Sequence, residues 1–267
     1  MSTPQTREEE WRAYLTGRHP TMLRERRIFR IFPHDPRCKL CNAPFAGIGS
    51  VLMRAIGKAR SSKNPNYCNM CEVRARKERG GAEIELTMLF ADVRGSTTLA
   101  EQMSARDFSQ LLNRFYDVAN RILIDSDALV DKLVGDEVIG LYLPYLPHHA
   151  ANAVQAARDL LAATGHTNPD GPWLPVGAGI HTGVAYVGIV GSEDTVVDFT
   201  ALGDAVNITA RLASLAGPGE VLVSDAATAA ASFDRGTLEH RELQLKGRTE
   251  PIGVSVVTAR ASADLPA

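Results

Sequence analysis

The chain has 267 residues, of which 45% are hydrophobic and 22% charged, and its formal net charge is −2. These values are typical of a soluble globular protein. No apolar run approaches the roughly 18–20 residues that a membrane-spanning helix needs, and the polar residues 2–10 lack a signal-peptide core. The composition therefore predicts a cytoplasmic protein without a membrane span.

The charges are divided unequally along the chain. Residues 1–80 contain 17 Lys and Arg against 7 Asp and Glu, whereas residues 81–267 contain 12 against 24. All four cysteines also lie in the first part. We therefore expect a basic module over residues 1–80, a larger domain over residues 83–260 and a tail over 261–267. The basic surface could dock on something acidic, or its arginines could simply be solvated.

The basic module is predicted to be mainly helical. Acidic residues in the first turn favour a helix over residues 7–16, and basic helical patterns follow over 22–31 and, more briefly, 51–56. The many basic side chains permit nucleic-acid contact. Stacking aromatics are scarce, however, since only Phe45 and Tyr67 lie between or beside the cysteines. Nucleic acid is therefore not the expected partner.

Two cysteine pairs, each with two residues between its members, predict a metal site. The ligands would be Cys38, Cys41, Cys68 and Cys71. Such paired knuckles can present four thiolates tetrahedrally, and in a reducing compartment they favour a metal over disulfides. The gap of 26 residues is longer than the common zinc-ribbon spacing, so we expect Zn²⁺ with an iron–sulfur cluster as the alternative. His34 could replace one ligand, although a surface histidine is the simpler interpretation.

The second part alternates strands and helices. An apolar run over residues 83–93 predicts a strand buried on both faces, and Ser104 is expected to cap a long amphipathic helix through Ile122. Two short strands, 128–133 and 137–143, should flank Gly135. Beyond them we expect a helix over 148–164, strands over 175–181 and 184–190, a helix over 203–216 and a strand over 220–224. This order predicts an α+β fold, a ferredoxin-like βαββαβ sandwich with helices on one face of the sheet.

Two aspartates end predicted strands. Asp92 and Asp136 each lie near a glycine, Gly95 or Gly135, that lets backbone and ligand approach closely. With no His or Cys nearby, such carboxylates suit hard cations like Mg²⁺ that carry phosphate substrates. Either aspartate alone would more often be a turn or cap residue. Their combination predicts a divalent-cation site.

An amide and a guanidinium lie four residues apart in Asn207 and Arg211. If this stretch is helical, both side chains face the same way. Alone they would simply form a solvated helix face. Together with metal-binding carboxylates, they suggest chemistry at a phosphorus atom.

Several segments resemble the catalytic domain of class III nucleotidyl cyclases, over about residues 83–260. They are residues 90–97 (FADVRGST), 131–136 (DKLVGD), 177–183 (GAGIHTG), 200–211 (TALGDAVNITAR) and 245–248 (LKGR). These segments follow the order of the family with similar gaps. The cysteine-bearing segment also resembles a module found ahead of some bacterial cyclases.

The resemblance implies a role for each motif residue. Asp92 and Asp136, with the backbone carbonyl of Val93, would hold two Mg²⁺ or Mn²⁺ ions. These ions would clamp a triphosphate and lower the pKa of the ribose 3′-hydroxyl, which attacks the α-phosphorus as pyrophosphate leaves. Asn207 would orient the ribose, and Arg211 would neutralise charge on the α-phosphate.

The resemblance also implies the substrate. Lys132 and Thr200 stand where the family reads the base, and a lysine donor with a threonine hydroxyl suits adenine rather than guanine. ATP is therefore the expected substrate; a guanylate or dual-specificity cyclase, or a non-catalytic nucleotide sensor, remains as an alternative. Lys246, or Arg248 in its place, would hold the terminal phosphates. Ser96 replaces an aromatic residue that many family members carry.

Lys132 and Asp136 are too close in sequence to serve opposite ends of one extended ATP within a single chain. The family resolves this with a head-to-tail homodimer. One chain provides the metal-binding aspartates, and the other provides Lys132, Thr200, Asn207 and Arg211. We further hypothesise that the cysteine module sets the orientation of the subunits.

Overall fold

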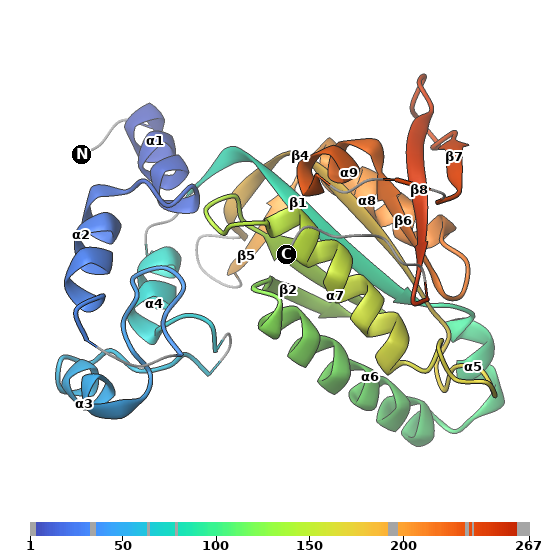
Figure 1. Ribbon diagram of the computed structural model, residues 1–267, viewed down its shortest axis with the longest axis horizontal. Coiled ribbons are helices and arrows are strands. Elements are labelled where there is room, and N and C mark those ends of the chain that lie inside the picture. The colour runs from blue at the N-terminus through green and yellow to red at the C-terminus, as the bar shows by residue number, and fades with distance from the viewer. Residues whose placement is uncertain are drawn as a thin grey trace. The chain divides into compact units, whose positions relative to one another are not determined.

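The computed structural model describes residues 4–32, 36–62, 65–77, 80–191, 197–232, 235–236 and 238–260 (Figure 1). The chain divides into two compact units. The first combines residues 1–84 with residues 186–202, and the second combines residues 85–185 with residues 203–267. The cysteine module therefore shares a unit with part of the larger domain. Among the described helices, none is both long and apolar enough to cross a bilayer.

Among the described residues, four helices form the N-terminal part of the first unit. They are α1 (Pro4–Leu15), α2 (Pro20–Phe29), α3 (Gly47–Ala55) and α4 (Asn69–Lys77). The three helices predicted in this region are confirmed, with ends shifted by a few residues. Proline at the first position of α2 has a φ angle preset for a helix. The fourth helix was not predicted, and it begins within the second cysteine pair.

A long β-hairpin completes the first unit. Its strands belong to β4 (Val176–Gly191) and β5 (Val197–Leu202), which pair antiparallel from Tyr186 opposite Leu202 to Gly191 opposite Val197. The predicted break of β4 at residues 182–183 is wrong, because the strand runs on without a turn there. Gly188 is needed in this hairpin, since a Cβ there would lie 2.3 Å from the carbonyl oxygen of Gly80.

The described strands form one eight-stranded sheet. Its order is β2-β3-β1-β4-β6-β8-β7, and β5 pairs with β4 outside this path. The remaining strands are β1 (Gly81–Val93), β2 (Leu129–Val134), β3 (Glu137–Tyr142), β6 (Glu220–Ser224), β7 (His240–Leu243) and β8 (Ile252–Thr258). Antiparallel pairing of β1 with β3 sets Asp92 opposite Glu137. This register brings the two predicted metal-binding segments together.

Helices cover one face of the sheet around a single large core. These are α6 (Ala105–Asp125), α7 (His149–Ala163) and α9 (Asp225–Ala231), and α6 and α7 lie side by side along the sheet (Figure 1), with the short α5 (Ser96–Gln102) preceding them. The predicted cap of α6 is confirmed, since Ser104 Oγ accepts a hydrogen bond of 3.1 Å from the backbone N–H of Asp107. Phe115 and Leu123 of α6 are fully buried against this core.

The helix α8 (Asp204–Leu215) packs on the opposite face. Along β6, Val221 and Val223 belong to the large core, whereas Leu222 between them packs with Ile208 and Leu212 of α8. Successive strand residues point to opposite faces, so α8 lies across the sheet from α6 and α7. The α+β fold is confirmed, but helices cover both faces and not one.

Close packing of α8 predicts a strong effect of a small substitution. A Cβ at Gly179 of β4 would lie 2.3 Å from the backbone nitrogen of Ala213, so Gly179→Ala must displace the helix. We expect a loss of about 2–3 kcal/mol of stability and a melting temperature lower by roughly 5–10 °C in thermal denaturation. Gly217→Ala is the matched control, because its Cβ would meet only the movable side chain of Glu220. Equal melting temperatures for the two variants would contradict this packing.

Candidate functional site

The carboxylates predicted to bind metal meet at one end of the sheet. Asp92 lies near the end of β1, and Asp136 lies in the β2–β3 turn beside Gly135, whose φ is +62°. The backbone N–H of Val93 donates a hydrogen bond of 3.1 Å to the carbonyl oxygen of Asp136. Tyr116 of α6 supports the turn, because its hydroxyl donates to the Gly135 carbonyl. The structure thus brings the three predicted metal-binding residues together.

This cluster of carboxylates is short of positive charge. Burial raises the pKa of Asp92, as does the charge of Asp136, while Arg94 opposes the shift. Burial and then the charges of Asp92 and Asp136 raise the pKa of Glu137 to about 7. Asp92 Oδ1 is buried without a hydrogen-bond partner in the described structure. An orphaned carboxylate oxygen beside two further acids fits a Mg²⁺ or Mn²⁺ site, since these ions prefer oxygen ligands.

The predicted phosphate-binding and ribose-binding residues meet at α8. Asn207 is exposed and Arg211, one turn later, is partly buried. The segment after β7 passes beside this helix, since a Cβ at Gly247 would lie 3.9 Å from Arg211 Nη2. Lys246 is exposed on this segment, whereas Arg248 is paired with Asp204 at the start of α8. The structure therefore brings Arg211 close to the segment that carries Lys246.

Of the two residues predicted to read the base, the structure describes Thr200 in full and Lys132 only in its backbone. Thr200 is buried in β5, where it lies opposite Gly188 of β4. The backbone of Lys132 belongs to β2, but its side chain lies outside the described part of the structure. His34, the alternative cysteine-site ligand, also lies outside the described residues.

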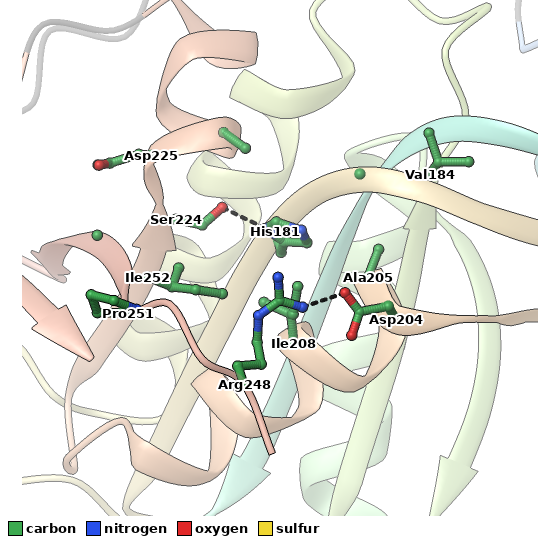
Figure 2. Close-up of a pocket in the computed structure, with 13 residues that line it drawn as sticks. His181, Val184, Asp204, Ala205, Ile208, Ser224, Asp225, Arg248, Pro251 and Ile252 are labelled. Carbon is green, nitrogen blue, oxygen red and sulfur yellow. Dashed lines mark hydrogen bonds and ion pairs between the residues drawn. The ribbon is translucent and has the colours of Figure 1, made fainter. Parts of the chain in front are cut away.

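A cavity of about 410 Å³ lies beside the first turn of α8 (Figure 2). Arg248 and Asp204, which both line it, form an ion pair, and His181 Nδ1 lies 2.8 Å from Ser224 Oγ on its wall. Asp92, Asp136, Asn207 and Arg211 are not among the residues that line it. This single-chain cavity is therefore distinct from the carboxylate cluster.

The four cysteines converge in the first unit. They are buried, free of disulfides, and their sulfur atoms all lie within 4.8 Å of one another. The Sγ atoms of Cys38 and Cys71 are 3.9 Å apart, and those of Cys41 and Cys68 are 3.8 Å apart. The backbone N–H groups of Cys68 and Cys71 point at the sulfurs of Cys38 and Cys68. The predicted grouping is confirmed, and this donor set fits one tetrahedral metal ion.

The four cysteine side chains shift one another's pKa values. Hydrogen bonds from the other cysteines hold the pKa of Cys68 far below its ordinary range, whereas the same contacts raise that of Cys71. A buried ammonium stands beside them, because Lys58 Nζ lies 3.7 Å from Cys41 Sγ and 3.1 Å from Glu25. The positive charge stabilises thiolates, the form that binds a metal.

Sequence reasoning missed two charged residues of the carboxylate cluster. Arg94 lies within a motif that was singled out, and Glu137 follows Asp136 directly. The position of Glu137 beside Asp92 could have been predicted from strand pairing. Glu137 begins the second strand of the expected hairpin around Gly135, and this strand pairs with β1. The side-chain contact of Arg94 has no such signal in the sequence.

Comparisons with known proteins identify one catalytic-domain family for the larger part of the chain. The profile of the Adenylate and Guanylate cyclase catalytic domain matches residues 81–257. An adenylate cyclase of Anabaena cylindrica is 28% identical over 187 residues, which is 65% of this chain and 37% of that protein. The terminal-differentiation specific adenylate cyclase of Dictyostelium discoideum is 33% identical over 134 residues, 49% of this chain and 6% of that protein. This chain thus spans well under half the length of both relatives.

Solved structures support the same fold. The guanylyl cyclase Cya2 superposes with a TM-score of 0.61 at 25% identity, covering 70% of this chain and 100% of that one. The adenylyl cyclase CyaB from P. aeruginosa superposes with a TM-score of 0.59 at 27% identity, covering 67% of this chain and 97% of that one.

The wall of the cavity predicts a pH dependence of stability. Burial, and then the charge of Arg248, lowers the pKa of His181 from 6.5 to about 4, whereas Asp204 acts to raise it. The unfolded chain therefore takes up a proton at higher pH than the folded chain. The neutral His181 therefore makes a contribution to the free energy of unfolding that is fully present above pH 6.5. This free energy falls by about 3 kcal/mol as the pH falls toward 4. His181→Gln should flatten this part of the curve in urea titrations between pH 4 and 7, and parallel curves would exclude the assignment.

Proposed function

The chain belongs to the adenylate and guanylate cyclase catalytic-domain family, and from this membership we propose that it converts ATP to 3′,5′-cyclic AMP and pyrophosphate. The observation that carries the proposal is the pair Asp92 and Asp136, with a buried and unpartnered carboxylate oxygen at the end of β1. Divalent cations that bind together with a triphosphate would balance the excess negative charge of these acidic groups. A nucleotide sensor without catalysis would not need this set of carboxylates.

Each residue of the site has a physical task in this reaction. Bound Mg²⁺ or Mn²⁺ ions would supply the charge that neutralises the triphosphate and makes the 3′-hydroxyl more acidic. Asp92, Asp136 and the carbonyl of Val93 would hold these ions. Asn207 would fix the ribose so that its hydroxyl is in line with the α-phosphorus, and Arg211 would stabilise the charge that develops there.

The terminal phosphates would be held by Lys246. The contacts around α8 distinguish Lys246 from Arg248, because Arg248 is already paired with Asp204 while Lys246 is exposed. An exposed ammonium near Arg211 can reach a flexible phosphate chain without breaking an existing ion pair. We therefore assign this task to Lys246.

ATP is the proposed substrate because of Lys132 and Thr200. The lysine ammonium can only donate hydrogen bonds, which suits N1 of adenine and opposes the protonated N1 of guanine. A threonine hydroxyl can accept a hydrogen bond from the exocyclic amine of adenine. The second candidate is a guanylate or dual-specificity cyclase, since the similar proteins include enzymes of both names.

The proposed active unit is a head-to-tail homodimer. Asp92 and Asp136 would come from one chain, and Lys132, Thr200, Asn207 and Arg211 from its partner. The exposure of Asn207 supports this arrangement, because a ribose-binding amide has to remain open toward the second chain. Two such sites would form in each symmetric dimer.

Mixing two inactive variants tests this arrangement. Asp92→Asn and Asn207→Ala should each lower cyclase activity by roughly 100-fold or more, because each removes a group that acts on the reacting phosphate or ribose. After equal mixing with subunit exchange, half of the dimers are mixed and each has one intact site. Cyclic AMP formation should then recover to about a quarter of the wild-type rate.

The control is Asp117→Asn, an exposed aspartate of α6, which should retain full activity. Full activity of Asp92→Asn would overturn the metal-site assignment. Verified mixed dimers that stay inactive would exclude the head-to-tail geometry. Parallel assays with GTP and Mn²⁺ decide the substrate, and a dominant cyclic GMP product would replace the ATP proposal by its alternative.

We propose that the four cysteines bind one Zn²⁺ ion. Four sulfurs around a single zinc, with Zn–S bonds of about 2.3 Å, lie about 3.8 Å apart. The separations of 3.8 and 3.9 Å between the paired sulfur atoms agree with this arrangement. An iron–sulfur cluster interposes several atoms between its cysteine ligands and needs them farther apart. Zinc is therefore favoured over a cluster.

The zinc module would regulate the base-binding strand through α1. The Tyr14 hydroxyl lies 3.5 Å from the carbonyl oxygen of Cys71, and the Tyr14 ring packs edge-on against Trp11 at 6.3 Å. The buried Trp11 ring lies 6.3 Å from that of Phe199, which precedes Thr200 in β5. Disorder at the cysteines can therefore reach Thr200 through the Tyr14 hydroxyl contact and two contacts between aromatic rings.

Removal of the zinc should alter catalysis in a defined way. We expect Cys38→Ser together with Cys41→Ser to abolish zinc binding, measured by elemental analysis. The KM for ATP should rise about three- to tenfold, because Thr200 would lose its support. Trp11→Leu, which retains the cysteines and zinc, should raise KM similarly. Unchanged activity of the zinc-free variant in a folded dimer would exclude regulation by this module.

A further inference from the structure

Arg94 links the first metal-binding carboxylate to the helix α8. One terminal nitrogen of its guanidinium pairs with Asp92 Oδ2. The other donates hydrogen bonds of 2.9 Å to the carbonyl oxygen of Ser214 and 3.4 Å to that of Ala216. The side chain is only 16% exposed, so this contact is largely shielded from water.

The contact is made at an electrostatically favourable place. The last carbonyls of a helix have no partners within the helix and carry a partial negative charge. Ser214 lies in the last turn of α8, and Ala216 is the first residue after the helix. The guanidinium thus joins two negative groups, the end of α8 and the carboxylate of Asp92. A lysine, with a single nitrogen, could not span both in this way.

The backbone of Arg94 is also held. Its N–H donates a hydrogen bond of 2.8 Å to the carbonyl oxygen of Pro175, and Asp92 precedes it by two residues on β1. The side chain therefore starts from a fixed point between the carboxylate cluster and α8. The same cluster includes Asp136 and Glu137, whose charges add to the need for a cation. Arg94 provides a positive charge at the place where a divalent ion has to bind.

We propose that Arg94 is a positioning residue that takes the place of the cation at Asp92 and is displaced from this carboxylate when a divalent ion binds. This inference rests on the proposed function, since it assumes that Asp92 is a metal ligand. Displacement leaves one half of the guanidinium on the end of α8, the helix that carries Asn207 and Arg211. In a head-to-tail dimer this helix serves the other active site. Arg94 therefore couples the occupancy of one site to the position of the helix at the second.

Metal binding without nucleotide tests the competition directly. Mn²⁺ affinity of the full chain should be measured by electron paramagnetic resonance, which counts free ions and needs no turnover. Loss of a charge-assisted hydrogen bond to Asp92 should tighten Mn²⁺ binding in Arg94→Gln by roughly ten- to a hundredfold. Arg94→Lys should stay near the wild-type affinity, because its ammonium can still pair with Asp92. Arg121→Gln, an exposed arginine of α6, is the control for net charge.

The coupling has its own measurement. Mn²⁺ binding to the wild-type dimer should be cooperative, and both Arg94→Gln and Arg94→Lys should bind Mn²⁺ without cooperativity. Unchanged or weaker Mn²⁺ binding by a folded Arg94→Gln would overturn the competition, and non-cooperative binding by the wild type would overturn the coupling. Asp92→Asn separates the two proposals. If it still binds Mn²⁺ as tightly as the wild type, the metal-site assignment itself fails; if it loses Mn²⁺ while Arg94→Gln is unchanged, only the role of Arg94 fails.

Discussion

The acidic groups at the end of β1 repel one another, and the arrangement of this site follows from the need to balance their charge. The β1–β3 register sets Asp92 opposite Glu137, and the hydrogen bond from Val93 holds the turn that carries Asp136. Three carboxyl groups in a partly buried place are costly unless a cation balances them. The raised pKa values of Asp92 and Glu137 express this cost, and Arg94 relieves part of it. A divalent ion would relieve it more completely, which is the physical reason, beside the resemblance, for proposing a cation site at this end of the sheet.

The second constraint is that, in the proposed head-to-tail dimer, one chain would supply only part of each reaction site. The described cavity lies at the start of α8, and its lining includes the paired Arg248 and Asp204 but none of the carboxylate cluster. Asn207 is meanwhile exposed on the sheet face opposite α6 and α7. A chain that carries both a cation cluster and an open phosphate-binding helix is suited to complete its sites with a second copy. In this arrangement the cavity beside α8 is not the place where the chemistry is expected.

Much of the fold could be predicted because its signals are local. The Ser104 cap and the apolar spacing of α6 needed only short-range chemistry. The predicted break in β4 was wrong because Thr182 and Gly183 resemble a turn, while in the sheet the Thr182 hydroxyl lies 2.7 Å from that of Thr87 on β1. The motif residues were found through their order and spacing, and the structure groups Asp92 with Asp136, and Arg211 with the Lys246 segment. The contact of Arg94 with Ser214 was beyond reach, since it joins residues 120 positions apart.

The division of the chain into units gives the cysteine module a specific place in this scheme. The module does not form a unit by itself but shares one with the β4–β5 hairpin and the start of β1. Trp11 packs on Phe199 of β5, and Arg12 donates a hydrogen bond to the carbonyl oxygen of Glu83 in β1. In the proposed scheme, a signal at the cysteines would act first on β5 and Thr200, whereas Arg94 would act on Asp92 and on α8. Binding of the base and binding of the triphosphate would thus be controlled from different units. Because both binding events are needed for one turnover, control of either one would be enough to limit the rate of cyclic nucleotide formation.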